Sequence, residues 1–200
     1  MVPKTNNQEL ALRSYFAGSS CAFLGSAGTG KTYLALYLAF KELLTNDMPV
    51  VIVRSAVPVR SIGHLPGTVE EKLVAYEAPY ISIATSLFNH SSAWENLKRL
   101  HGCSFIPTSF IRGITLDNCT VIVDEAENLT FQELDSVVTR LGVNSRLIIC
   151  GDSRQSDLRD SGLDRMISIL SPLIAVTTFQ PEDIVRSSFV RDYIIRRDSL

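Results

Sequence analysis

The chain has 200 residues, of which 46% are apolar and 20% are charged, as is ordinary for a soluble globular protein. Its 19 basic and 21 acidic residues give a net charge of -2, which excludes a globally basic surface but not a local basic groove. No apolar run reaches the length of about 18 residues that a membrane span needs, and the polar N-terminus lacks a signal-peptide core. We therefore expect a cytoplasmic protein with no membrane partner, folded as one domain over residues 1–200.

Four cysteines occur in the chain, and none of them forms a C-x-x-C pair or a zinc-binding spacing. Three lie in apolar runs that are typical of strands, so we expect buried, reduced thiols. These cysteines are Cys21, Cys103, Cys119 and Cys150.

Short apolar runs alternate with segments of helical periodicity. In chain order we predict a strand over 21–25, a helix over 31–45, a strand over 48–56, a turn-rich loop over 58–67, helices over 68–90 and 91–102, a strand pair closed by a turn over 103–118, a strand over 119–128, a helix over 130–142, a strand over 145–152, a helix over 161–170, a strand over 173–179 and a closing helix over 187–198. This alternation predicts an α/β fold with a mostly parallel sheet flanked by helices.

Three local signals support these boundaries. Thr68 with Glu71, and Thr130 with Glu133, have the spacing of helix capping boxes. Gly142 is positioned to end the helix that begins after Thr130.

Residues suited to ligand binding stand at the ends of four predicted strands. They are Gly25, Arg54, Asp124 and Asp152. In an open parallel sheet the ligand binds outside the carboxyl ends of the strands. A scaffold alone would not require such residues at all four ends.

The segment GSAGTGKT, residues 25–32, matches the phosphate-binding pattern G-x-x-x-x-G-K-[ST] between a predicted strand and a predicted helix. Its glycines allow several backbone N–H groups to face one anion, at the positive end of the following helix. Lys31 can reach the β- and γ-phosphates, and the Thr32 hydroxyl can bind Mg²⁺. The alternative, a glycine-rich turn without a ligand, does not require Lys-Thr after the glycines. The expected nucleotide contacts are Ser26, Ala27, Gly28, Thr29, Gly30, Lys31, Thr32 and Tyr33.

Polar residues after two later strands favour hydrolysis over simple binding. Asp124 ends an apolar strand and is expected to complete the Mg²⁺ ligands, while Glu125 can orient and deprotonate the attacking water. Gln155, after the strand over 145–152, can donate to the γ-phosphate or position that water. Solvated acids after a strand, and a polar loop residue, are the alternatives.

Several ordered motifs resemble the PhoH family of phosphate-starvation-inducible ATPases, whose core is similar to that of superfamily-one helicases. Besides the phosphate loop they are TNNQ at the start, VVIVRSAV, GHLPGTVEEK, SFIRGITLDN, VIVDEAEN, TRLG, GDSRQSDL and EDIVRSSFV, covering roughly residues 5–195. Ser26 replaces the usual proline, Glu127 replaces the usual glutamine of DEAQ, and VRSAV replaces T-R-P-A-V. Because glutamate is an acceptor only, the change at Glu127 affects any contact made by that glutamine amide.

The resemblance implies a RecA-like P-loop NTPase that hydrolyses ATP with Mg²⁺. By matching position, Gln8 corresponds to the glutamine that recognises adenine, with a solvated terminal residue as its alternative. Arg186 looks like an arginine finger. Because the chain has room for one core only, the resemblance implies a homo-oligomer, as a hexameric ring, in which Arg186 completes a neighbour's site.

RNA, or another single-stranded nucleic acid, is the partner that the resemblance implies. Arg54 and Arg112 are the candidates to contact its backbone, with structural ion pairs as the alternative for both. The leading hypothesis is a Mg²⁺-dependent ATPase coupled to RNA, by helicase-like or RNA-processing action. The alternatives are an ATP-dependent switch or scaffold with slow turnover, an intrinsic ribonuclease, for which no separate residues are found, and a small-molecule kinase.

Overall fold

The computed structural model describes residues 1–55, 69–155, 158 and 161–197, with the backbone alone for 69–73. Within this part of the chain six strands form one sheet in the order β3-β2-β4-β5-β1-β6, and every neighbouring pair is parallel. The predicted α/β fold with a parallel sheet is confirmed. The strands are β1 Cys21–Gly25, β2 Val50–Arg54, β3 Cys103–Pro107, β4 Thr120–Val123, β5 Arg146–Gly151 and β6 Ala175–Phe179.

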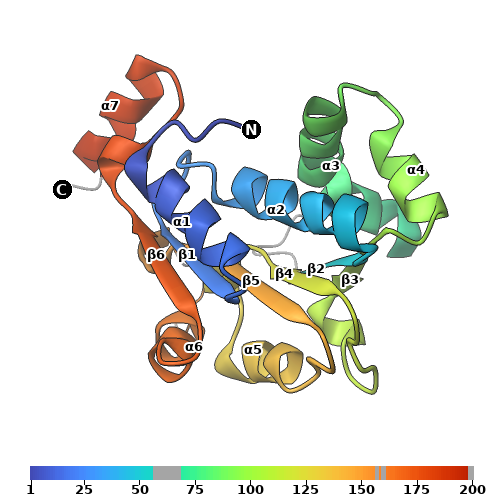
Figure 1. Cartoon of the computed structure of the whole chain (residues 1–200). Coiled ribbons are helices and arrows are strands. Elements are labelled where there is room, and N and C mark those ends of the chain that lie inside the picture. The colour runs from blue at the N-terminus through green and yellow to red at the C-terminus, as the bar shows by residue number, and fades with distance from the viewer. Residues whose placement is uncertain (56–68, 156–157, 159–160, 198–200) are drawn as a thin grey trace.

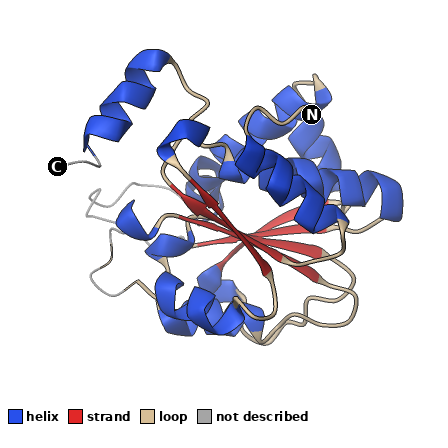
Figure 2. Ribbon diagram, turned by 60° about the vertical axis from the view of Figure 1, so that its left-hand side comes forward, coloured by secondary structure: helices blue, strands red, loops and turns tan. Residues whose placement is uncertain are grey.

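Helices cover both faces of this sheet (Figure 1). The helices α1 to α4 lie over one face and α5 and α6 lie over the other, while α7 stands outside both layers. The strands fan across one another with the twist that is usual for parallel sheets (Figure 2). The helices are α1 Asn6–Phe16, α2 Lys31–Asn46, α3 Val69–Phe88, α4 Ala93–Arg99, α5 Phe131–Val138, α6 Leu163–Leu170 and α7 Ser188–Arg197.

The sheet divides the core in two because alternate strand residues point to opposite faces. Phe23 and Ile122 belong to the cluster under α1, α2 and α3, while Ala22 and Val121 belong to the cluster under α5 and α6. Apolar residues on both faces explain why the strand sequences are continuous apolar runs. All four cysteines are buried with free thiols, as predicted. Among the described residues, no helix combines the length and the apolar character of a membrane span.

The predicted strand pair over 103–118 is wrong. Only β3 forms, and a 3-10 turn at Thr108–Phe110 follows it. Leu116 then makes an isolated parallel bridge with Leu141. The apolar residues after the turn are buried under the sheet, with Ile111 at 0% and Leu116 at 5% exposure. Burial against the face under α5, rather than strand pairing, therefore accounts for the apolar character of this segment.

The helix α5 begins as predicted, with a capping box between Thr130 and Glu133. It ends at Val138, however, and not at Gly142. The N–H of Gly142 donates to the carbonyl of Leu116 at 2.9 Å. A Cβ at Gly142 would lie 1.9 Å from Oδ1 of Asp117. Gly142 is thus required by a close approach between two loops and not by the end of a helix.

The helix α1 was not predicted from the polar N-terminus. Its N-cap is Thr5, whose hydroxyl accepts a hydrogen bond from the N–H of Gln8 at 3.3 Å. Its buried face includes Ala11, Leu12 and Tyr15. The predicted capping box at Thr68 and the GHLPG motif, residues 63–67, lie outside the described residues, at least in part.

Candidate functional site

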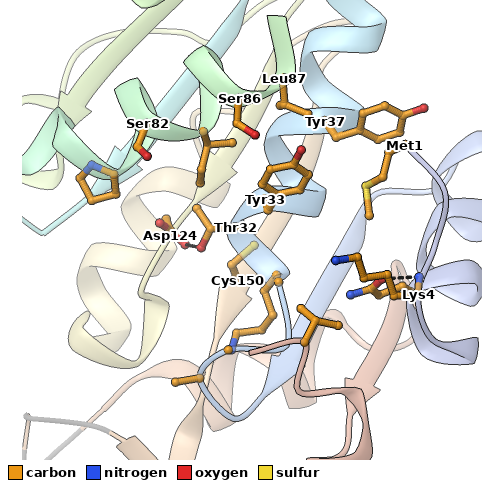
Figure 3. A pocket seen from close by; sticks show the side chains of 18 of the residues that line it. Met1, Lys4, Thr32, Tyr33, Tyr37, Ser82, Ser86, Leu87, Asp124 and Cys150 are labelled. Carbon is orange, nitrogen blue, oxygen red and sulfur yellow. Dashed lines mark hydrogen bonds between the residues drawn. The ribbon is translucent and has the colours of Figure 1, made fainter. Parts of the chain in front are cut away.

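A cavity of about 1230 Å³ lies at the carboxyl ends of β1, β4 and β5. The loop after β1 forms the floor of this cavity, and residues of α2 and α3 line its walls (Figure 3). Of the predicted nucleotide contacts, Ala27, Gly28, Gly30, Lys31, Thr32 and Tyr33 line this cavity. The structure therefore gathers the phosphate loop and the later strand ends around one space.

The loop after β1 depends on its glycines. Gly25, Gly28 and Gly30 have φ angles of 130°, 81° and 86°, which L side chains rarely adopt. A Cβ at Gly25 would lie 2.2 Å from the carbonyl oxygen of Phe179 on β6. The curled backbone and its close contact with the neighbouring strand therefore both require glycine.

Lys31 begins α2 and lies across the loop. Its Nζ donates to the carbonyl oxygens of Gly25 and Ser26, the second at 3.0 Å. The side chains of Ser26 and Thr29 are buried, and the Thr29 hydroxyl donates to the Ser26 carbonyl at 3.0 Å. These two residues shape the loop from within, whereas Lys31 presents a cation to the cavity.

Gln8 of α1 supports the phosphate loop. It is 3% exposed, so the solvated alternative is excluded. Its Nε2 donates to the Thr29 carbonyl at 3.0 Å, and its Oε1 accepts from the N–H of Lys4 at 2.8 Å. The Gln8 amide retains one N–H donor and one oxygen lone pair. A hydrogen-bond pair with the edge of a nucleotide base would use one of each.

Thr32 and Asp124 form the candidate Mg²⁺ site. The Thr32 hydroxyl donates to Oδ1 of Asp124 at 2.9 Å, and Asp124 is 4% exposed (Figure 3). Neighbouring ligands of an octahedral ion with bonds of about 2.0–2.1 Å have a similar separation. A carboxylate and a hydroxyl oxygen beside a phosphate loop are ligands that suit Mg²⁺.

Tyr80 of α3 is a member of this site that sequence reasoning missed. Its hydroxyl donates to Oδ2 of Asp124 at 3.0 Å, and its side chain is fully buried. Burial, with the nearby Asp124 carboxylate, raises the pKa of Tyr80 far above its usual value. No local pattern in the sequence marks Tyr80, because its partner lies 44 residues away.

Glu125 has a strained backbone and an arginine partner. Its φ and ψ are 49° and 47°, in the left-handed region, where a non-glycine residue is strained by roughly 1–3 kcal/mol. The Arg54 guanidinium forms an ion pair with Oε2 of Glu125. Burial raises the pKa of the Glu125 carboxyl, and Arg54 opposes that rise. The proposed base and the proposed nucleic-acid contact are therefore direct partners.

Glu127 joins the ends of β4 and β5. Its Oε2 accepts from the backbone N–H of Asp152 at 3.1 Å. Burial raises the pKa of Glu127 to about 7. A carboxyl group is a donor when protonated. Glu127 can therefore supply a hydrogen-bond donor near neutral pH, which modifies the expectation that it only accepts.

Gln155 ends a 3-10 turn, Ser153–Gln155, that follows β5. Its Nε2 donates to Oδ2 of Asp152 at 2.7 Å, and it lines the cavity. The neighbouring Arg154 donates to Oγ of Ser26 at 3.3 Å. The loop after β5 is thereby bonded to the phosphate loop of the same chain.

Arg186 lines the cavity beside its own phosphate loop. A Cβ added at Gly28 would lie 2.9 Å from Cγ of Arg186. The N–H of Val185 donates to the Gly28 carbonyl at 3.0 Å. The structure thus places Arg186 beside the phosphate loop of its own chain, and its role in a neighbouring subunit stays a prediction.

The two arginines proposed for nucleic acid lie in different surroundings. Arg54 lies beside Glu125 and Tyr80, at the inner edge of the site. Arg112 is exposed in a turn after β3, and neither arginine is among the described residues that line the cavity. Arg54 is therefore connected to the site through Glu125, which lines the cavity, and Arg112 is not.

Known proteins resemble this chain along most of its length. A PhoH-like protein of Mycobacterium bovis is 32% identical over 202 residues, which cover 96% of this chain and 56% of that protein. A PhoH-like protein of Synechocystis is 36% identical over 84% of this chain and 53% of its own length. The chain spans about half the length of the curated relatives it matches.

Among solved structures, Pif1 helicase from Candida albicans is 18% identical, covers 89% of this chain and 39% of its own, and gives a TM-score of 0.43. The family model described as PhoH-like protein matches residues 1–196. This match, together with identities of 32% and 36% to curated relatives across most of the sequence, shows that the chain belongs to the PhoH-like protein family.

Proposed function

We propose that this chain is a Mg²⁺-dependent ATP hydrolase of PhoH type whose turnover is coupled to RNA. The observation that carries the proposal is the arrangement of Lys31, Thr32, Asp124 and Glu125 around one cavity. Lys31 and Thr32 begin α2, and Asp124 and Glu125 follow the end of β4 in the same parallel sheet. A phosphate loop alone would support nucleotide binding, and the carboxylate of Glu125 beside it supports hydrolysis.

In the proposed mechanism, different residues bind the phosphates, hold Mg²⁺ and activate the attacking water. Backbone N–H groups at the start of α2, together with Lys31, bind the phosphates. Thr32 and Asp124 would hold Mg²⁺, which would supply positive charge to offset the negative charge of the phosphates. Glu125 orients a water, whose oxygen attacks the γ-phosphorus as the bond to the β–γ bridging oxygen breaks. The water proton passes to the Glu125 carboxylate, and ADP and inorganic phosphate leave.

Gln155 and Arg186 complete the proposed site. The Gln155 amide donates to Asp152 in the structure, and in the proposed mechanism it donates to the γ-phosphate when nucleotide is bound. Arg186 lies beside Gly28, where a permanent cation opposes negative charge on the transferring group. We propose this role for Arg186 within its own chain.

The coupling to RNA is proposed through Arg54. This arginine forms an ion pair with Glu125, and guanidinium groups bind phosphates well. When a nucleic-acid phosphate binds Arg54, the ion pair between Arg54 and Glu125 breaks, and Glu125 can then orient water. Arg54 links a backbone contact to the hydrolytic step, which supports RNA as an activator of turnover.

The same ion pair favours a second candidate, a nucleotide-dependent switch or scaffold with slow turnover. While Arg54 holds Glu125, a bound ATP is hydrolysed slowly and the nucleotide-bound state persists. The two candidates differ in whether a nucleic acid increases the rate. A homo-oligomeric ring, hexameric by resemblance, remains a proposal that sedimentation with an ATP analogue and Mg²⁺ tests.

The decisive experiment measures phosphate release from ATP with Mg²⁺, for the wild type, Lys31→Ala and Arg54→Ala. We expect Lys31→Ala to lose at least about 100-fold of the rate, in line with the loss of one preorganised charged contact. Arg13→Ala, which alters an exposed pair on α1, is the matched control and retains the rate. A wild type without ATP-dependent phosphate release would overturn the proposed hydrolase.

The RNA arm repeats the assay with single-stranded RNA, single-stranded DNA and duplex at two salt concentrations. We expect RNA to stimulate the wild type, with less stimulation at the higher salt because phosphate contacts weaken as salt rises. Arg54→Ala should lose the stimulation. Equal rates with and without every nucleic acid would favour the switch.

A further inference from the structure

A buried tyrosine on α3 is bonded to the candidate metal ligand. Tyr80 is 0% exposed, and its hydroxyl donates to Oδ2 of Asp124 at 3.0 Å. The other carboxylate oxygen, Oδ1, accepts from Thr32 at 2.9 Å. Both oxygens of Asp124 are therefore engaged, so rotation of this carboxylate would break at least one hydrogen bond.

The direction of the bonds around Tyr80 follows from the partners. The nearby Arg54 cation also acts on the Tyr80 hydroxyl, and it lowers the pKa that burial raises. Arginine can only donate, and an ionised carboxylate can only accept. The Tyr80 hydroxyl must then be the donor in its bond with Asp124. This hydroxyl is bonded to the proposed ligand of Mg²⁺ and lies near Arg54, the partner of Glu125.

The ring of Tyr80 is fixed by its neighbours. It stacks on Trp94 with a centroid distance of 6.1 Å and contacts the tilted ring of Phe105 at 5.9 Å. Trp94 is in turn fixed, because its indole N–H donates to Oε2 of Glu77 at 2.7 Å. The hydroxyl therefore reaches Asp124 from a packed aromatic cluster and not from a mobile side chain.

We propose that Tyr80 is a positioning residue, which holds the Asp124 carboxylate in the orientation that binds Mg²⁺. The proposal rests on the proposed function at this site. A ligating carboxylate is commonly oriented by an outer hydrogen-bond partner, and loss of such a partner lowers metal affinity by about 10- to 100-fold. Tyr80 has this relation to Asp124, although it lies outside the phosphate loop and the acidic motif.

The test titrates Mg²⁺ against binding of a fluorescent, non-hydrolysable ATP analogue to the whole chain. For Tyr80→Phe we expect the Mg²⁺ midpoint to rise about 10- to 100-fold, with the affinity for the analogue without Mg²⁺ unchanged. The rate of hydrolysis should recover at high Mg²⁺. Tyr15→Phe is the matched control, because Tyr15 is also fully buried but its hydroxyl contacts Thr120 at 3.3 Å, away from the acids.

A double-mutant cycle separates positioning from a general loss of structure. If Tyr80 acts through Asp124, adding Tyr80→Phe to Asp124→Asn should change the midpoint little further, because coupled residues are not additive. Trp94→Phe keeps the hydroxyl but loosens its ring, and we expect a severalfold rise in the midpoint. It serves as the second variant should Tyr80→Phe fail to fold.

Two outcomes would overturn the proposal for Tyr80, and a third would contradict the proposed function on which it rests. A folded Tyr80→Phe with an unchanged midpoint, or a Trp94→Phe with an unchanged midpoint, would show that Tyr80 does not position Asp124. A wild type that binds the analogue identically with and without Mg²⁺ would instead contradict the proposed Mg²⁺-dependent function.

Discussion

The two edges of the sheet each contain an arginine–glutamate pair, and the pairs differ in their surroundings. At the amino edge, Arg146 of β5 pairs with Glu42 of α2 at 2.6 Å, and both side chains are mostly buried, at 16% and 14% exposure. At the carboxyl edge, Arg54 pairs with Glu125, whose side chain is 42% exposed. One pair is enclosed by protein, whereas the other borders the cavity.

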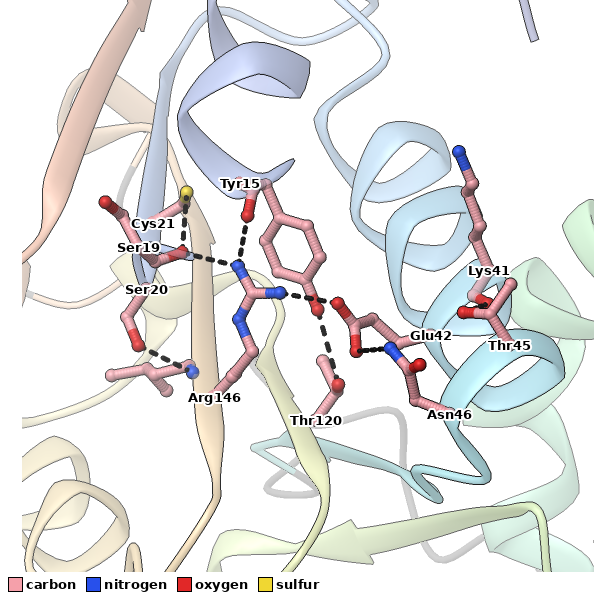
Figure 4. Close-up of polar contacts among 11 residues, drawn as sticks. Tyr15, Ser19, Ser20, Cys21, Lys41, Glu42, Thr45, Asn46, Thr120 and Arg146 are labelled. Carbon is pink, nitrogen blue, oxygen red and sulfur yellow. Dashed lines mark hydrogen bonds and ion pairs between the residues drawn. The ribbon is translucent and has the colours of Figure 1, made fainter. Parts of the chain in front are cut away.

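The pair at the amino edge belongs to a dense polar cluster (Figure 4). Arg146 also donates to the carbonyls of Tyr15 and Ser19, the second at 2.9 Å. Its guanidinium lies 3.5 Å from the centroid of the Tyr15 ring. The cluster joins the end of α1 and the start of β5 to α2, and so contributes to the stability of the fold.

At the carboxyl edge the backbone is strained and polar groups face the cavity. Glu125 has a left-handed backbone, and Lys31 is bonded to loop carbonyls that it can exchange for phosphate oxygens. The difference indicates that buried, ion-paired charges serve stability, while strained and accessible charges at the opposite edge serve a ligand.

The largest expected effect is on the rate of ATP hydrolysis, and it should distinguish Glu125 from Glu42. Glu125→Gln should lower ATP hydrolysis by about 10²- to 10⁴-fold, because the amide cannot accept the water proton, while ATP binding persists. Glu42→Gln should leave the rate per folded molecule within about twofold and lower the stability, since it removes the partner of Arg146. Phosphate release and denaturant unfolding of both variants check this contrast. Equal phosphate release by wild type and Glu125→Gln would refute the catalytic-base assignment.

The two arginines should differ in stability. Arg146→Ala leaves Glu42 with a buried charge, and we expect the free energy of unfolding to fall by about 3–5 kcal/mol. Arg54→Ala should lower it by no more than about 1 kcal/mol, because Glu125 is accessible to water. Urea titrations followed by circular dichroism give both values. A larger loss for Arg54→Ala than for Arg146→Ala would reverse the comparison.

A smaller effect depends on pH and on Glu127. Its pKa is raised from 4.5 to about 7 in the folded chain, so folding favours the protonated carboxyl. The resulting contribution to stability is fully present below pH 4.5 and is lost as the pH rises through 7. Relative to Glu127→Gln, the wild type should lose up to about 3 kcal/mol of stability from pH 4.5 to 8. Urea unfolding of both proteins across this range measures the difference, and a constant difference would contradict the raised pKa.

Local sequence patterns predicted most of the elements, but the signal for α1 at the N-terminus was overlooked. The α1 residues Ala11, Leu12 and Tyr15 have helical spacing after Thr5 and Gln8, which have the spacing of a capping box. This signal could have predicted the helix. What it could not predict is the attachment of α1 to the distant segment after β6, where Asn7 donates to Asp183 at 2.7 Å.

The sequence by itself determined the parallel α/β architecture, the phosphate loop and the acids at Asp124 and Glu125. These follow from periodicity, residue conformation and spacing over a few residues, which are local properties. Only the tertiary structure joined Arg54 to Glu125 and Tyr80 to Asp124, over separations of 71 and 44 residues. The order of strands in the sheet decides such contacts, because it sets which strand ends are neighbours. For the same reason Arg186 lies beside its own phosphate loop, while its role in a neighbouring chain stays a prediction.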